Sequence, residues 1–145
     1  MSINARSVQG KCYCGSIHFE LTFPTTFCSH CHCEDCRRSH GAAFVTWTSV
    51  PLAQFKFLAG EKILRKYESH PGIFWEYCGE CGTSLFYESK ELPDRVDITV
   101  ANLTGPLDRE PDSHASFEEH VSWLTVADEL PQYRGKTALI TEKLT

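Results

Sequence analysis

The cysteines of this sequence stand in closely spaced groups, and that spacing limits what the chain can fold into more than any other feature. There are eight cysteines in 145 residues, against a single methionine. Buried cysteines that bind nothing rarely group together along a whole chain, so the spacing indicates a shared chemical role. The groups, in chain order, are Cys12 and Cys14, then Cys28, Cys31, Cys33 and Cys36, then Cys78 and Cys81.

Metal binding explains this pattern better than disulfide bonds do. A chain of this length can bury a sufficient core without cross-links, and its start, from Met1 to Val8, contains no apolar signal segment. We therefore expect a cytoplasmic protein, and in a reducing compartment closely spaced cysteines indicate metal ligands or catalytic thiols. A C-x₂-C turn directs two thiolates at one tetrahedral ion, and all-thiolate sets favour Zn²⁺, with iron next. Zinc is the predicted cofactor.

The spacing alone leaves open which cysteines share an ion. In a sequential scheme, the first four cysteines along the chain bind one ion and the last four bind a second. In an enclosing scheme, the two outer pairs bind one ion and the compact group between them binds the second. The similar segments Tyr13-Cys14-Gly15 and Tyr77-Cys78-Gly79 favour the enclosing scheme. Its outer ion would close a long chain loop, so that its binding energy would contribute to folding.

Apolar residues that alternate with polar ones predict a mainly β domain with little helix. Ile17, Phe19, Leu21 and Phe23 predict a half-buried strand that Pro24 ends. The segment Cys28–Cys36 is expected to be a loop, and Glu34–His40 to form one or two helical turns that Gly41 ends. The segment 121–126 is expected to be a short element before an extended tail. Further strands, separated by Pro and Gly turns, are expected at Phe44–Val50, Phe55–Leu58, Ile63–Tyr67, Phe74–Tyr77, Ser84–Tyr87 and Val96–Ala101.

Charge and hydropathy exclude two classes of partner. The formal net charge is −5, so the chain lacks the basic surface that binding to a phosphate backbone requires. No apolar run approaches the roughly 20 residues that would span a bilayer. We therefore expect neither nucleic acid nor a membrane as a partner, and a single domain over residues 1–145 with no linker or low-complexity stretch.

Three motifs resemble those of one known family. The run from Cys31 to Arg38, C-H-C-E-D-C-R-R, resembles the family's C-H-C-x-x-C-R-[RK] signature. Cys78-Gly-Glu-Cys81-Gly-Thr-Ser-Leu-Phe resembles its C-G-x-C-G-T-x-L-F, and Gly10-Lys-Cys-Tyr-Cys14-Gly resembles its G-x-C-x-C-G. The family is that of glutathione-dependent formaldehyde-activating enzyme and centromere protein V, and the resemblance extends over about residues 10–132.

This resemblance implies a fold, a set of ligands and a reaction. The implied fold is a β-tent of packed antiparallel sheets held by zinc. The implied structural zinc ligands are Cys12, Cys14, Cys78 and Cys81. A second zinc would be bound by Cys31, Cys33 and Cys36, with one coordination position open for catalysis. The implied activity is that of a carbon–sulfur lyase, with glutathione and formaldehyde as substrates and S-hydroxymethylglutathione as the product.

Cys28 lies outside the family's core motif and has two interpretations. As a fourth thiolate it would close the second site against substrate. As a spare thiol near that site it would leave the open position accessible. We favour the spare thiol.

The chemistry expected at the second site is the addition of a bound thiolate to a small aldehyde. The resulting oxyanion needs one proton, and His30, His32 and His40 are near enough in sequence to be candidate donors, although none is distinguished by its spacing. His114 and His120 could approach from the C-terminal part of the chain. Arg37 or Arg38 could pair with a substrate carboxylate, although a solvated helix face explains them equally simply. The tryptophans at 47, 75 and 123 are expected in the core or in a pocket wall.

Two functions of other classes remain open at this stage. A zinc-stabilised binding protein without turnover would use both ions as structural supports. A redox or zinc sensor would release metal when its thiols are oxidised. The leading hypothesis is the thiol-adduct enzyme, with its substrate unassigned.

Overall fold

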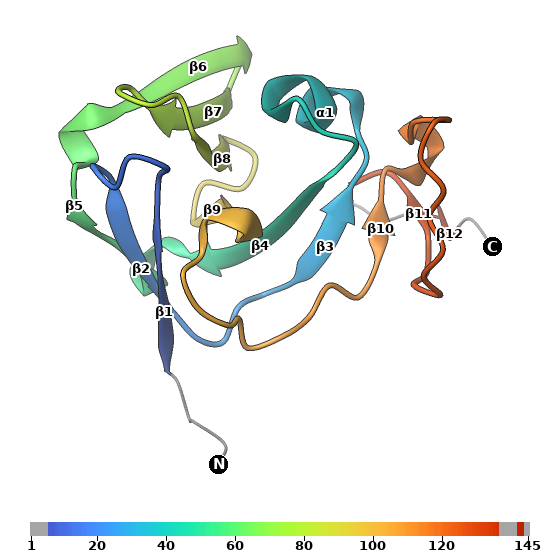
Figure 1. Cartoon of the computed structure of the whole chain (residues 1–145), viewed down its shortest axis with the longest axis horizontal. Coiled ribbons are helices and arrows are strands. Elements are labelled where there is room, and N and C mark those ends of the chain that lie inside the picture. Colours follow the sequence, from blue (N-terminus) through green and yellow to red (C-terminus); the bar gives the residue numbers. More distant parts are fainter. Residues whose placement is uncertain (1–5, 137–141, 144–145) are drawn as a thin grey trace. The chain divides into compact units, whose positions relative to one another are not determined.

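A computed structural model describes residues 6–136 and 142–143, and these residues form a mainly β fold with one α-helix, α1 (Glu34–His40) (Figure 1). The chain divides into two compact units: the first contains the chain up to Thr26 and Thr48–Arg109, and the second contains Phe27–Trp47 and the chain from Glu110 onward. The strands are β1 (Ser7–Lys11), β2 (His18–Thr22), β3 (Cys28–Cys31), β4 (Val45–Pro51), β5 (Phe55–Ala59), β6 (Leu64–His70), β7 (Ile73–Cys78), β8 (Ser84–Ser89), β9 (Arg95–Thr99), β10 (His114–Ala115), β11 (Tyr133–Arg134) and β12 (Glu142–Lys143).

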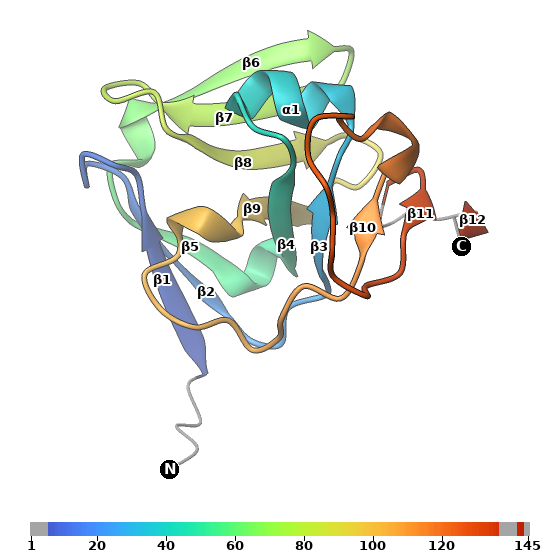
Figure 2. The same cartoon turned by 45° about the vertical axis from the view of Figure 1, so that its right-hand side comes forward.

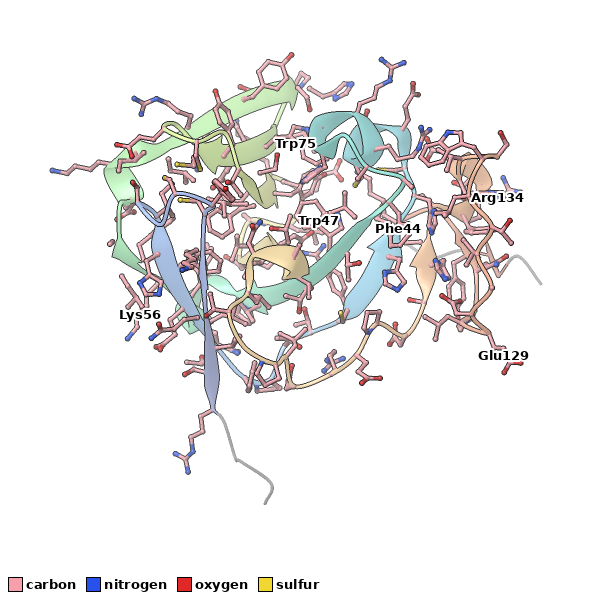
Figure 3. All side chains as sticks on the ribbon, viewed as in Figure 1. Phe44, Trp47, Lys56, Trp75, Glu129 and Arg134 are labelled. Carbon is pink, nitrogen blue, oxygen red and sulfur yellow. The ribbon has the colours of Figure 1, made fainter. Side chains whose placement is uncertain are left out.

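The first unit is built from two antiparallel arrangements of strands. One is the three-stranded sheet β1-β2-β5, in which Gly10 lies opposite Phe19. The other runs in the order β9-β8-β7-β6, and its strands lie side by side in Figure 2. On this sheet the Lys56 side chain points outward, and its Nζ lies 3.3 Å from the Glu20 carboxylate (Figure 3).

Aromatic rings fill the core of the first unit. Phe19 on β2 is fully buried. Its ring packs edge-on against Phe86 of β8 at a centroid distance of 5.0 Å, and it lies tilted by 30° against Phe55 of β5 at 5.7 Å. Offset and edge-on packing of this kind adds stability beyond the burial of apolar area. The alternation that predicted a strand is therefore confirmed, since Ile17, Phe19 and Leu21 all face this core. Cys12 and Cys78 also belong to this core. The turns that follow β1 and β7 therefore begin inside the packed interior.

The second unit combines β3, α1, the first residues of β4 and the C-terminal strands. Strand β10 pairs with β3 in parallel, with His114 opposite His30 and Ala115 opposite Cys31. Helix α1 starts at Cys33, whose sulfur accepts a hydrogen bond from the Cys36 amide, and ends at Gly41, which adopts a left-handed conformation with φ 59°. Glycine is the usual residue at that position because it has no Cβ to clash. The predicted helix and its end are confirmed.

Four expectations from the sequence are wrong in detail. The segment Cys28–Cys36 is not a continuous loop, because its first residues form β3. The partners of β3 come from a distant part of the chain: the His30 amide donates to the Ser113 carbonyl oxygen and the His32 amide to that of Ala115. The strand expected at Val96–Ala101 ends at Thr99 in a 3-10 turn, and residues 121–126 form no helix or strand. The parallel pairing of β10 and β3 also departs from a purely antiparallel fold.

The mainly β class and the low helix content are confirmed, whereas the β-tent arrangement and the single domain stay predictions. In the described part of the chain, no helix has the length and apolar character needed to cross a membrane.

Replacing Gly10 by alanine should destabilise the first unit. A Cβ at this position would overlap the Phe19 ring, which is fully buried and cannot move without disturbing Phe55 and Phe86. Overpacking of this kind costs about 1–3 kcal/mol. Gly105→Ala is the control, since its added Cβ would meet only Val8 Cγ2 at an ordinary 3.4 Å. Thermal denaturation should show a clearly lower Tm for Gly10→Ala alone, and equal Tm values for the two variants would contradict the packing described here.

Candidate metal centres

The first unit brings four cysteine sulfurs together. Every sulfur in the group lies within 4.8 Å of the others, and the group consists of Cys12, Cys14, Cys78 and Cys81. The Cys12 and Cys14 sulfurs are 3.5 Å apart, and those of Cys14 and Cys78 are 3.9 Å apart. This grouping agrees with the enclosing scheme rather than with the sequential one, since residues more than sixty positions apart in sequence share one cluster.

Two tight turns shape this four-cysteine group. After β7, the Gly82 amide donates to the Cys78 carbonyl oxygen at 2.9 Å, and the Cys81 amide approaches the Cys78 sulfur at 3.5 Å. Gly82 has a φ of 77°, a conformation that favours glycine. After β1, the Ile17 amide donates to the Cys12 sulfur at 3.3 Å. Amide donors aimed at sulfur stabilise the thiolate form, which is the form that binds metal.

Thr83 connects the two turns, a role that the sequence gave no reason to expect. Its hydroxyl oxygen accepts a hydrogen bond from the Tyr13 amide at 3.0 Å and lies 3.1 Å from the Cys81 sulfur. The Thr83 hydroxyl is the main cause that lowers the pKa of Cys81 to about 5. Burial raises the pKa of Cys78 to about 11. The group therefore contains thiols that ionise readily beside one that ionises only when a cation is near.

The second unit brings together three further sulfurs, those of Cys31, Cys33 and Cys36, all within 4.8 Å of one another. Each of these cysteines is less than one tenth exposed. Cys31 is the last residue of β3, Cys33 caps the N-terminus of α1, and Cys36 lies in the first helical turn, where its amide donates to the Cys33 sulfur at 3.2 Å. The step from strand to helix thus turns three thiols toward one point.

The pKa shifts in this three-cysteine group suit a bound cation. Hydrogen bonds from the thiols of Cys33 and Cys36 lower the pKa of Cys31 to about 3, and the Ser116 hydroxyl contributes in the same direction. The same contacts with the Cys31 sulfur raise the pKa of Cys33 and Cys36. Without a positive charge among them, the three thiols therefore do not readily ionise together. A soft divalent ion such as Zn²⁺ supplies that charge, so both cysteine groups fit zinc.

Cys28 does not join the three-cysteine group. It is the first residue of β3 and is fully buried. Side chains in a strand alternate between its two faces, so residues three positions apart point in opposite directions. Cys28 and Cys31 are separated by three positions, and this explains why the Cys28 sulfur lies outside the cluster. In this structure Cys28 is therefore not grouped with the other three sulfurs, and its role stays a prediction.

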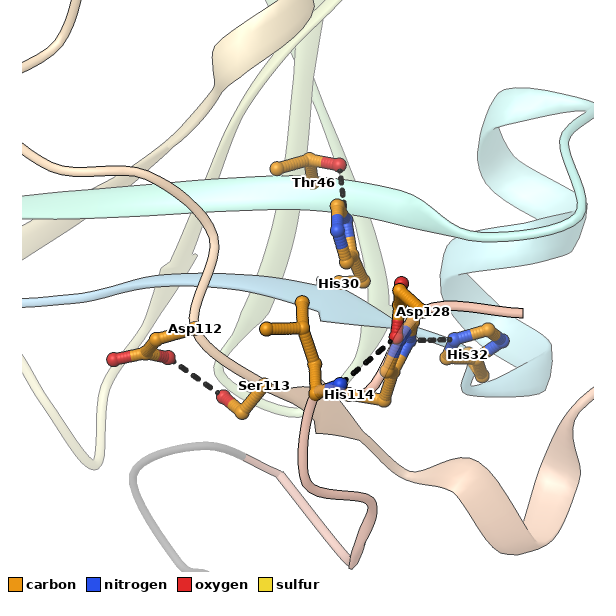
Figure 4. Close-up of polar contacts among 8 residues, drawn as sticks. His30, His32, Thr46, Asp112, Ser113, His114 and Asp128 are labelled. Carbon is orange, nitrogen blue, oxygen red and sulfur yellow. Dashed lines mark hydrogen bonds and ion pairs between the residues drawn. The ribbon is translucent and has the colours of Figure 1, made fainter. Parts of the chain in front are cut away.

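Two buried histidines and an aspartate form a chain of polar contacts (Figure 4), and His32, the first of them, lies between Cys31 and Cys33 in the sequence. His32 Nε2 lies 2.8 Å from His114 Nδ1, and His114 Nε2 lies 2.9 Å from the Asp128 carboxylate. Because the carboxylate only accepts, His114 Nε2 carries a proton. His32 and His114 are each almost fully buried, and His32 Nδ1 has no hydrogen-bond partner among the described residues. The sequence singled out both histidines but gave no signal for Asp128.

The remaining histidines named from the sequence have local partners. His30 Nδ1 is 2.8 Å from the Thr46 hydroxyl (Figure 4). His40 Nδ1 donates to the Cys36 carbonyl oxygen at 2.9 Å, and its ring packs edge-on against Trp47. His120 stacks on Phe117 with ring centroids 4.1 Å apart. All of them lie in the second unit, and His40 makes the most direct contact with a cysteine of the group.

The arginines and tryptophans fall into different environments. Arg37 Nε donates to the His32 carbonyl oxygen at 3.2 Å, and this bond braces the peptide between two of the cysteines. Arg38 pairs with Glu34 on the exposed face of α1, in line with a solvated helix face. Trp47 is buried and Trp75 is half-buried, as expected. The expectation for Trp123 is wrong, because its side chain is 73% exposed in a segment without regular structure.

Comparison with known proteins gives one family and two relatives. The family model for glutathione-dependent formaldehyde-activating enzyme matches residues 7–120. An uncharacterised lyase from Schizosaccharomyces pombe is 29% identical over 84 residues, which cover 54% of this chain and 56% of the relative. The chain thus spans little more than half the length of this curated relative. A crystal structure of a Rhodobacter sphaeroides protein is similar with a TM-score of 0.56 and 25% identity, covering 70% of this chain and 92% of that one.

Single cysteine substitutions should separate the two groups. Cys78→Ser is expected to abolish soluble folded protein, because structural zinc sites contribute on the order of 10 kcal/mol to folding. Cys33→Ser should leave a folded chain that has lost one metal ion. Cys28→Ala, the matched control, should keep both ions. Metal content per chain by mass spectrometry, with circular dichroism for folding, measures all three. If Cys33→Ser unfolds the protein as completely as Cys78→Ser does, the two groups do not differ in role.

Proposed function

Because the chain belongs to the glutathione-dependent formaldehyde-activating enzyme family, we propose that it is a zinc-dependent enzyme that adds a small aldehyde such as formaldehyde to a thiol such as glutathione. The family match covers most of the chain, and the similar fission-yeast protein is named a lyase, so both support a lyase-type function. The carbon–sulfur class, the thiol and the aldehyde are our proposal, as is a cytoplasmic location.

The observation that carries this proposal is the composition of the three-cysteine group. Three buried sulfurs converge within 4.8 Å of one another, and the nearby Cys28 is not among them. Structural zinc sites have four protein ligands, whereas catalytic sites have three and keep one position for substrate. Zinc held by Cys31, Cys33 and Cys36 would supply a Lewis acid at which a substrate thiol is bound as its thiolate. The four-cysteine group would instead hold a structural ion.

The proposed reaction forms one bond and needs no oxidant or reductant. The sulfur of the substrate thiol attacks the carbonyl carbon, and the new carbon–sulfur bond replaces the carbonyl π bond. That electron pair moves to the oxygen, and the proton that leaves the sulfur is balanced by the proton that the oxygen gains. The product is an S-hydroxymethyl thioether, and the reverse reaction releases aldehyde and thiol. A free thiol has a pKa near 8.5, so ionisation alone would accelerate the reaction only modestly at neutral pH.

Positioning of the reactants therefore has to supply most of the acceleration, which can reach several kcal/mol in well-oriented sites. The chain's own residues provide a rigid frame for it. Cys33 is fixed by its capping bond to the Cys36 amide, and Cys31 by the pairing of β3 with β10. The bond from Arg37 to the His32 carbonyl oxygen holds the peptide that joins these two cysteines. The low exposure of all three cysteines keeps water away from the bound sulfur.

Exchange between glutathione and ¹³C-formaldehyde tests the proposal, because the adduct also forms without an enzyme and only its rate should change. Zinc-loaded wild-type protein should accelerate the exchange measured by NMR at least about 100-fold, the low end for one positioned catalytic group. Cys33→Ser should lose this acceleration, and Cys28→Ala should retain it as the control. Saturable glutathione binding without acceleration would contradict the enzyme and support a binding protein instead. Replacing glutathione by 2-mercaptoethanol shows whether the peptide part of the thiol contributes.

A further inference from the structure

The outer edge of β6 has no strand beside it in the described part of the chain. β6 is the last strand in the order of its sheet and pairs with β7 on its inner side (Figure 2). Four consecutive residues of β6, from Arg65 to Glu68, are exposed. Alternate residues of an antiparallel strand direct their amide and carbonyl groups to opposite edges, so about half of these backbone groups face outward. Such an edge is a template for pairing with another chain.

Three other strands that end a described sheet differ from β6. The edge of β1 is covered, since the Thr104 amide donates to the Gln9 carbonyl oxygen at 2.8 Å. The edge of β10 is covered in the same way, because the His114 amide donates to the Pro131 carbonyl oxygen at 2.9 Å. β5 also ends a sheet, but Lys56 is its single charged residue. No pairing of β5 with a copy of itself therefore matches opposite charges.

An aromatic row crosses the sheet and ends at the β6 edge. Trp75 of β7 lies opposite Tyr67 of β6 on one side and opposite Tyr87 of β8 on the other. The three side chains therefore share one face of the sheet. Trp75, labelled in Figure 3, packs edge-on against Tyr87 with ring centroids 4.9 Å apart. Tyr67, at the end of the row, is 63% exposed, so an aromatic ring on an added strand could continue the row there.

The charges beside Tyr67 make β6 complementary to itself. Lys66 precedes Tyr67 and Glu68 follows it. When two identical antiparallel strands pair about Tyr67, this residue faces its own copy, and Lys66 of each strand faces Glu68 of the other. A pairing centred on Lys66 or on Glu68 would instead place a charge opposite an identical charge, which is destabilising. Charges on an edge usually oppose pairing with foreign strands, whereas the order of these charges favours a second copy.

Both charged side chains keep capacity for this contact. Lys66 Nζ lies 3.2 Å from the Glu76 carboxylate and 3.0 Å from that of Glu88. An ammonium group has three donors, so one remains without a hydrogen-bond partner among the described residues. Glu68 Oε1 accepts from the Gly72 amide at 2.9 Å, which leaves Oε2 available. These bonds orient Lys66 and Glu68 before any pairing occurs, and this reduces the cost of ordering them.

We propose that the β6 edge is an interaction surface for a second copy of this chain, with the two β6 strands paired antiparallel about Tyr67 in a two-fold dimer. In a two-fold dimer the same surface of both copies forms the contact, which is what a self-complementary strand provides. One pair of strands is small beside a standard interface of about 1,600 Å², so the dimer should be in exchange with the monomer. The inference does not depend on the proposed function, since it involves no cysteine.

Charges introduced at the two-fold position test this pairing. Sedimentation velocity of the full-length wild-type protein, from micromolar to millimolar concentration, should show a shift from monomer to dimer. Tyr67→Lys and Tyr67→Glu each place a charge against its own copy, so each variant alone should stay monomeric. An equimolar mixture of the two should recover the dimer, because the facing charges are then opposite. Trp123→Lys is the matched control: it replaces an aromatic side chain that is 73% exposed in the second unit, and it should dimerise like the wild type.

Amide hydrogen exchange locates the contact and needs no substitution. Exchange in β6 of the wild type should slow as the protein concentration rises, whereas in Tyr67→Lys it should not depend on concentration. A wild type that stays monomeric, or whose β6 exchange does not change with concentration, would overturn the proposal. Dimers that persist in both folded Tyr67 variants would place the contact elsewhere and overturn it too. A mixture of the two variants that stays monomeric would overturn the pairing about Tyr67.

Discussion

Mutual repulsion among closely packed thiolates is the interaction on which the rest of this structure depends. Within each of two cysteine groups the sulfurs lie within 4.8 Å of one another, and all of these cysteines except Cys14 are buried or half-buried. In the three-cysteine group, hydrogen bonds from the thiols of Cys33 and Cys36 lower the pKa of Cys31, and the contact with the Cys31 sulfur raises the pKa of Cys36. A soft divalent cation would remove the conflict in both groups, and its binding would then stabilise the fold that brings the sulfurs together.

Different local structures bring the sulfurs of the two cysteine groups together. In the first unit, two turns at the ends of β1 and β7 enclose the sulfurs, and Thr83 links the turns through Tyr13 and Cys81. Four ligands complete a tetrahedron, which suits a structural ion. In the second unit, the end of β3 and the first turn of α1 supply only three sulfurs. In this second unit, Ser116 adopts a left-handed backbone conformation, and the contacting pair His32 and His114 is buried. The four-cysteine group is built from ordinary turns.

The sequence predicted the parts of this arrangement that depend on local spacing. Alternation identified the strand around Phe19, and the capping pattern identified α1 with its end at Gly41. The motif resemblance implied the two sets of cysteines that the structure groups. Contacts between distant segments escaped prediction: β3 depends on hydrogen bonds to Ser113 and Ala115, and Asp128 reaches His114 from a segment without regular structure. The conformation of Ser116 likewise has no signature in sequence, because nothing in the local pattern requires a positive φ for a serine.

Anomalous diffraction at the zinc edge from crystals of the freshly purified, reduced protein tests the central claim most directly. The account predicts two peaks, one among Cys12, Cys14, Cys78 and Cys81, and one among Cys31, Cys33 and Cys36. The second ion should have a non-protein or solvent ligand at its fourth position. A second peak coordinated by the Cys28 sulfur, or no peak at the three-cysteine group, would contradict it.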